Sequence, residues 1–81
     1  MYSTSILFCD GLDYGLLRSD APDVVEQVRG QANVSVMEYD GKTVQARVPL
    51  HLLAKGFLFP ENKGLRKMAQ SGGNGSMHIS H

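Results

Sequence analysis

The chain has 81 residues, with eight basic and eight acidic side chains and a single cysteine. This length fits one domain, and a chain this short buries only about 60% of its unfolded surface. The lone Cys9 excludes an intramolecular disulfide, and the longest apolar run, residues 6–9, is too short for a membrane span or a secretory signal. The composition therefore predicts a small soluble protein of the reducing cytosol.

The charges are segregated along the chain. Residues 1–40 hold two basic and seven acidic side chains, whereas residues 41–81 hold six basic and one acidic. Such a division is typical of a surface for nucleic acid or an acidic partner, of head-to-tail self-association, or of halves that neutralise each other within one fold. The six cations are spread too thinly to form a dense patch, which favours neutralisation within the fold.

The first elements are predicted to be two strands. Residues 3–9 contain β-branched and aromatic side chains and are followed by an acidic, glycine-containing turn. Residues 14–18 are predicted to return as a second strand, which Gly15 weakens. The alternative is one strand followed by a long loop within residues 1–18.

The main helix is predicted over residues 21–29. Asp20 is predicted to cap it, Pro22 suits its first turn, and Gly30 is predicted to end it. A helix of about two and a half turns is not stable alone, so it must pack on the sheet. Its apolar face consists of Val24, Val25 and Val28.

Residues 33–48 alternate around Asp40-Gly41, which predicts a β-hairpin. A two-residue turn would mix apolar and polar side chains on each face. A three-residue loop, residues 39–41, separates them and is favoured; it places Val36 opposite Val44, Val34 opposite Ala46, and Glu38 opposite Lys42. The predicted core face is then Val34, Val36, Val44, Ala46 and Val48. The predicted solvent face is Ser35, Met37, Thr43, Gln45 and Arg47.

Two further short helices are predicted, over residues 50–55 and 65–70. Between them, Phe57-Leu58-Phe59 is predicted to be extended or irregular, with either the phenylalanines or Leu58 in the core. Residues 71–81 are rich in glycine and serine and are predicted to be a flexible tail outside the domain of residues 1–70. The predicted fold is α+β: a small, mostly antiparallel sheet in the order ββαββαα, with the main helix on the central hairpin.

No motif for catalysis or for metal binding is recognisable. The acidic turn at residues 10–15 lacks the alternating oxygen ligands of a calcium loop, and the two tail histidines are too few for a metal site. Catalysis would require a pocket that gathers Asp13, His51 or Cys9, and no local signature predicts one. We therefore expect no cofactor, no metal and a function that is not enzymatic.

Two binding functions are predicted instead. The first is a protein-interaction module, such as a regulator, inhibitor or assembly component, that binds another protein or forms a homodimer. Its candidate contacts are Met37, Tyr39, Thr43, Gln45, Arg47 and Leu58. The alternative is nucleic-acid binding by the basic half, with candidate contacts at Lys42, Arg47, Lys63, Arg66 and Lys67.

Overall fold

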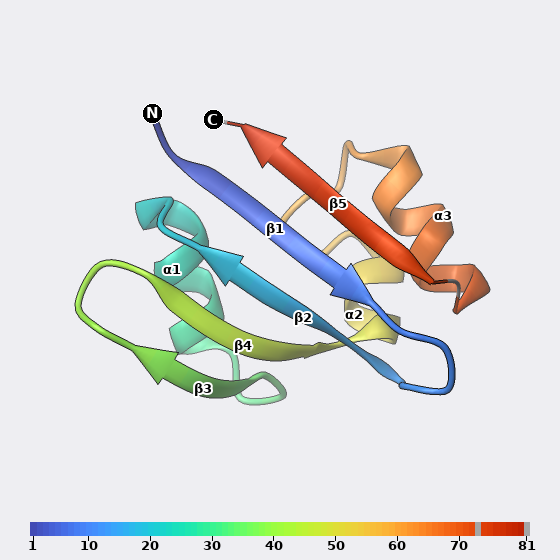
Figure 1. Cartoon of the computed structure of the whole chain (residues 1–81), viewed down its shortest axis with the longest axis horizontal. Coiled ribbons are helices and arrows are strands. Elements are labelled where there is room, and N and C mark those ends of the chain that lie inside the picture. The colour runs from blue at the N-terminus through green and yellow to red at the C-terminus, as the bar shows by residue number, and fades with distance from the viewer. Residues whose placement is uncertain (73, 81) are drawn as a thin grey trace.

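The computed structural model describes residues 1–72 and 74–80, which form five strands and three helices in two layers (Figure 1). The strands are β1 (Ser3–Phe8), β2 (Tyr14–Ser19), β3 (Ser35–Tyr39), β4 (Val44–Pro49) and β5 (Gly75–Ser80). The helices are α1 (Pro22–Gly30), α2 (Leu50–Ala54) and α3 (Lys63–Ser71). The strands lie in the order β3-β4-β2-β1-β5, and all neighbours are antiparallel. The predicted α+β class and the order of the first seven elements are confirmed.

The helices all lie behind the sheet in the view of Figure 1, so they cover one face only. Side chains at alternate positions of β1, β2 and β4 point into this layer and meet one face of each helix. As predicted, the valines of α1 pack in the same core cluster as the valines of β4. The most deeply buried apolar residues are Ile6, Phe8, Leu17, Val28, Val44, Ala46, Val48, Leu53 and Leu65.

The start of α1 is held by neighbouring strands rather than by the predicted Asp20 cap. The Asp20 carboxylate accepts a hydrogen bond from the Ser3 backbone N–H, at 2.8 Å. The N-cap residue is Ala21, whose N–H donates to the buried Ser19 hydroxyl at 3.1 Å, and that hydroxyl lies 2.7 Å from Thr4 Oγ1. The cap prediction is wrong because Asp20 lies opposite the beginning of β1, where its carboxylate meets another donor.

The β3–β4 hairpin has a longer loop than predicted. Tyr39 pairs with Val44, which leaves four residues, 40–43, in the loop. Farther along, the register shifts at Met37, which forms a bulge. The three-residue loop is therefore wrong, as are the predicted pairs Val36–Val44, Val34–Ala46 and Glu38–Lys42; Val36 pairs with Ala46, and Glu38 with Gln45.

Asp40 explains the longer loop. Its Oδ1 accepts hydrogen bonds from the backbone N–H groups of Lys42 and Thr43, at 2.9 and 2.7 Å. Gly41 adopts the positive φ, +94°, that this turn requires. The loop conformation is thus set by a side chain that competes with strand pairing, which alternation along the strands does not reveal.

The predicted faces of the hairpin are nevertheless retained in its regular part. Val36 pairs two residues away from its predicted partner, and a shift of two residues keeps a side chain on the same side of the sheet. Val36 itself is 42% exposed, which corrects its assignment to the core, because β3 lies at the edge of the sheet. The other four predicted core residues are buried: Val34, Val44, Ala46 and Val48.

The prediction of a flexible tail is wrong for Gly75–Ser80, which form β5 and pair with the whole of β1. Met77 and Ile79 pack against the core, and polar residues alternate with them. Alternation is a strand signal, but so short a segment forms a strand only where an edge such as β1 supplies hydrogen-bonding partners. The sheet thus extends beyond the predicted boundary at residue 70; Gly73 and His81 lie outside the described residues.

The segment between α2 and α3 contains a tight turn at Leu58. Leu58 has φ of +71°, and the Phe59 N–H donates to the Phe57 carbonyl at 2.9 Å, which closes a γ-turn. All three residues are half-buried against the core. The prediction that either the phenylalanines or Leu58 would be buried is wrong, because a turn does not alternate side chains as an extended chain does.

The close packing of β2 at Gly15 predicts the effect of a single methyl group. A Cβ on Gly15 would lie 2.9 Å from Ile6 Cγ2 and 3.4 Å from Leu53 Cδ1. We expect Gly15→Ala to lower the free energy of unfolding by about 1–3 kcal/mol, measured by urea denaturation. The matched control is Gly30→Ala, whose added Cβ meets no atom within 4 Å; its effect should stay within about 0.5 kcal/mol. Equal losses would contradict this account.

The loop carboxylate predicts a pH dependence. Backbone hydrogen bonds from Thr43 and Lys42 lower the pKa of Asp40. Because the folded pKa lies below the unfolded value, the ionised group stabilises the fold above about pH 4, and this contribution is lost as pH falls through the folded pKa. Asp40→Ala should therefore destabilise the chain at neutral pH by an amount that shrinks in acid, as measured by urea denaturation across this range. Asp40→Asn, which keeps an uncharged acceptor for the loop N–H groups, should show a smaller deficit at neutral pH that also shrinks in acid. A deficit for Asp40→Ala that stays constant with pH would contradict the prediction.

Candidate functional site

The sheet face that the helices leave uncovered, called the open face below, points toward the viewer in Figure 1. The strand register places two rows of side chains across it, from β3 to β5. One row consists of Ser35, Arg47, Leu16, Leu7 and Ser76. The other consists of Glu38, Gln45, Arg18, Ser5 and His78.

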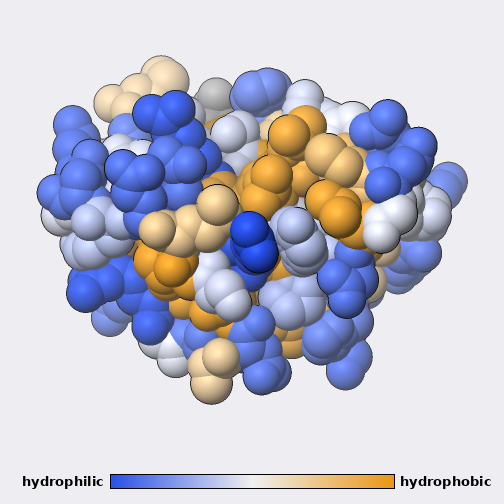
Figure 2. Space-filling model, turned by 60° about the horizontal axis from the view of Figure 1, so that its bottom comes forward, coloured by the Kyte–Doolittle hydropathy of each residue, from blue (hydrophilic) through white to orange (hydrophobic). Residues whose placement is uncertain are grey.

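The open face combines apolar and cationic side chains. Leu7 is 44% exposed and Met37, at the bulge of β3, is 52% exposed. Arg18 and Arg47 are exposed on β2 and β4 between them. Figure 2 shows this face obliquely, with the β3 edge turned forward, and apolar groups lie on both sides of a strongly hydrophilic centre. The open face therefore carries two large exposed apolar side chains with two arginines between them.

Arg47 is positioned by the aromatic ring of Tyr14, its diagonal neighbour on β2. The guanidinium carbon lies 5.2 Å from the ring centroid, within the range of a cation–π contact. The N–H groups of Arg47 make no hydrogen bond to the described residues. The planar edge of Arg47 is thus oriented and available for a carboxylate or phosphate group.

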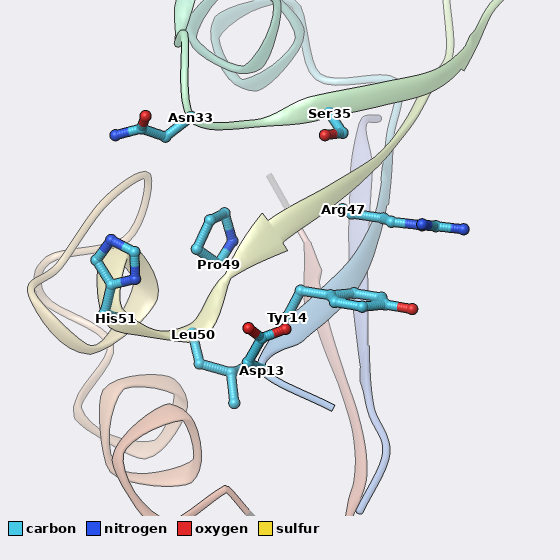
Figure 3. Close-up of a pocket in the computed structure, with 8 residues that line it drawn as sticks. All are labelled: Asp13, Tyr14, Asn33, Ser35, Arg47, Pro49, Leu50 and His51. Carbon is cyan, nitrogen blue, oxygen red and sulfur yellow. The ribbon is translucent and has the colours of Figure 1, made fainter. Parts of the chain in front are cut away.

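A hollow of about 580 Å³ adjoins the open face at Arg47 (Figure 3). In Figure 3, the side chains of Arg47 and Tyr14 lie at one end, those of Asn33 and His51 at the other, and Pro49 between them. The hollow forms because β4 continues past Ser35, the first residue of β3, so that Pro49 has no neighbour on that side. Its lining consists of Asp13, Tyr14, Asn33, Ser35, Arg47, Pro49, Leu50 and His51.

The hollow contains two of the residues that catalysis would require. Asp13 and His51 both line it, whereas Cys9 does not. Their side chains are not joined by a hydrogen bond or ion pair, and in Figure 3 they lie on opposite sides of Leu50. Within residues 1–72 and 74–80, no three His, Cys, Asp or Glu side chains are close enough to hold a metal ion. The hollow therefore offers hydrogen-bonding groups without an aligned proton-transfer pair.

The six predicted partner contacts are divided between different surfaces. Thr43 lies at the entry to β4, in a small hollow that also includes His78. Tyr39 lies on the helix side, where the Arg29 guanidinium covers its ring at 4.1 Å from the centroid. Leu58 belongs to the helix layer, far along the chain from the hairpin. Met37, Gln45 and Arg47 lie on the open face, and Thr43 lies at its margin, next to Ser5 and Arg18 of that face.

The five predicted phosphate contacts are not brought together. Lys42 lies in the β3–β4 loop, at the other end of the molecule from α3 (Figure 1). Arg47 lies on the open face, on the side of the sheet away from the helices. Arg66 donates to the backbone carbonyls of Ala54 and Pro60, at 3.3 and 3.4 Å, and so links α2 to α3. The members that belong to α3 are Lys63, Arg66 and Lys67.

Sequence reasoning missed the apolar, aromatic and cationic side chains that β1 and β2 contribute to the open face: Leu7, Tyr14, Leu16 and Arg18. Alternation in residues 14–18 was a usable signal, because Gly15 and Leu17 face one way and the other residues face the opposite way. Both sides contain a leucine, so the pattern alone did not show which side the helices cover.

The chain has no match among protein-family models, curated proteins or solved structures. No helix in residues 1–72 and 74–80 is long and apolar enough to cross a membrane. A proposal about function therefore rests on the chemistry of the surfaces described above.

Proposed function

We propose that this chain is a small protein-interaction module that acts by binding rather than by catalysis, and that the open face contacts the partner. The observation that supports this proposal is the exposure of Leu7 and Met37 beside Arg18 and Arg47, on a sheet with helices on one side only. A partner that covers these large apolar side chains removes them from water. Their burial stabilises the complex by roughly 25 cal/mol per Å² of apolar surface. A regulator, an inhibitor and an assembly component all fit this description.

The charges on the open face favour an acidic partner. Its two rows of side chains carry Arg18 and Arg47 against Glu38 alone. An arginine held over a tyrosine ring loses little freedom when it binds a carboxylate bidentately. A second copy docked through the same face would bring arginines toward arginines, which is unfavourable. The proposed partner therefore presents carboxylates next to apolar side chains.

The hollow beside Arg47 supports an anchoring role for that residue. Binding energy in protein interfaces is concentrated at arginines and aromatic residues next to pockets that a partner side chain can fill. Arg47 and Tyr14 belong both to the open face and to the hollow wall. A partner that pairs a carboxylate with Arg47 can place its neighbouring side chain over Pro49, toward Asn33 and His51.

Nucleic acid is the alternative partner. Arg47 and Tyr14 support it, because a basic groove with a stacking ring is how single strands are bound. It is less well supported, because the other proposed phosphate contacts lie elsewhere on the molecule.

We propose the cytoplasm as the site of action, which the single free cysteine, Cys9, supports.

Photo-cross-linking in cells of the source organism tests this proposal. A photoreactive amino acid at Leu7 or Met37 should capture a protein, and the yield should fall by about tenfold when Arg47→Glu is added, because a charge-assisted contact becomes repulsive. The matched control places the same amino acid at Lys67, which is exposed on α3. Products are measured by gel shift and mass spectrometry.

Two outcomes would contradict the proposal. Equal capture from Lys67 and from the open-face positions would show that contact is not specific to this face. Products whose gel shift is abolished by a nuclease would favour nucleic acid. Arg47→Lys provides a further comparison, since it keeps the charge but loses the planar edge and should retain only part of the yield.

A further inference from the structure

The two edges of the sheet differ in how they are protected from pairing. The β3 edge carries a bulge at Met37 and a charge at Glu38, both of which hinder the addition of another strand. The β5 edge has neither: it pairs with β1 at six consecutive positions without a shift. Its sequence, Gly-Ser-Met-His-Ile-Ser, contains no Lys, Arg, Asp, Glu or Pro. The outer backbone groups of β5 are thus an unprotected template for a further strand.

The sequence of β5 is self-complementary. Residues 76–80 read Ser-Met-His-Ile-Ser, which is symmetric in side-chain type about His78. If a second copy pairs antiparallel about His78, serine meets serine, His78 meets its own copy, and Met77 meets Ile79 of the second copy. A two-fold interface requires this reciprocity, since each contact of residue i with residue j must recur as j with i. The symmetry favours a second copy over an unrelated peptide.

The helix layer beside β5 has room for the added side chains. A hollow of about 380 Å³ lies next to Ile79, and the γ-turn residues Leu58 and Phe59 line it together with Pro60, Glu61 and Asn62. Residues directly opposite on paired strands have Cβ atoms about 4.5–5.5 Å apart. Met77 of the second copy would lie opposite Ile79 on the helix side, beside this hollow. The flexible methionine side chain is well suited to fill such a space.

We propose that the chain forms a homodimer in which two β5 strands pair antiparallel about His78, so that two five-stranded sheets become one continuous sheet. The two-fold axis is then perpendicular to the sheet, because His78 lies on the open face in both copies. Both open faces consequently lie on the same side of the dimer and stay uncovered. This inference goes beyond the proposed function and does not depend on it.

A charge exchange at His78 tests the proposal by sedimentation velocity over a wide concentration range. His78→Lys alone and His78→Glu alone each put like charges directly opposite, so each should raise the dimer dissociation constant by about fivefold or more. An equimolar mixture puts Lys opposite Glu and should form the heterodimer at the parental affinity or tighter. His78 is exposed, and Arg18 and Asp20 line the same small hollow, so both charges have an opposite charge near them in their own chain.

The control pair is Gln45→Lys and Gln45→Glu, on the same open face but on β4, away from the β5 edge. Both should dimerise as the parent does, and circular dichroism should confirm folding of all four variants. A monomeric parent at every concentration, dimers unaffected by either His78 variant, or a mixture that does not regain affinity would each overturn the proposal. Dimers weakened at Gln45 instead would assign the interface to the open face.

Discussion

The whole structure depends on covering one face of a five-stranded antiparallel sheet. None of the three helices is long enough to be stable by itself in water, so each derives its stability from the apolar residues it buries against the strands. The alternating side chains of β1, β2 and β4 supply that surface. Because every helix lies on the same side, the opposite face is left to solvent. The open face is thus a direct consequence of how the core is built.

Local irregularities in the backbone allow side chains to pack closely in this core. Gly15 lacks a Cβ where Ile6 and Leu53 approach β2 most closely. The γ-turn at Leu58 costs conformational energy, yet it lets three consecutive apolar residues contact the core between two short helices. Thr4 and Ser19 are the buried polar residues of the described chain, and their hydroxyls satisfy each other beside the start of α1. Departures from regular geometry therefore follow from packing.

Two surfaces of different chemistry result from this architecture. The open face carries arginines beside apolar side chains, which suits an acidic partner and disfavours a second copy. The β5 edge is uncharged and symmetric about His78, which suits a second copy. Pairing at β5 would leave both open faces exposed on one side of the dimer. A partner with two acidic sites would then gain affinity by binding both faces at once.

The sequence by itself determined the class of the fold, the first seven elements and the part of the core that the main helix and the hairpin supply. The helix at Pro22–Gly30 and the valine faces of the hairpin follow from periodicity, which depends on local backbone geometry alone. Of the candidate contact surface, the sequence identified Met37, Thr43, Gln45 and Arg47, all of them in or next to the hairpin. It did not identify the residues of β1 and β2, because a strand with leucines on both sides does not show which side the helices cover.

Only the tertiary structure decided the hairpin register, the last strand and which face of the sheet is exposed. The register depends on hydrogen bonds between the Asp40 carboxylate and the loop backbone. The strand at Gly75–Ser80 exists because β1, at the other end of the chain, offers a free edge. These features arise from contacts between segments that are remote in sequence or from competition between side chain and backbone. Alternation within one segment contains no information about either.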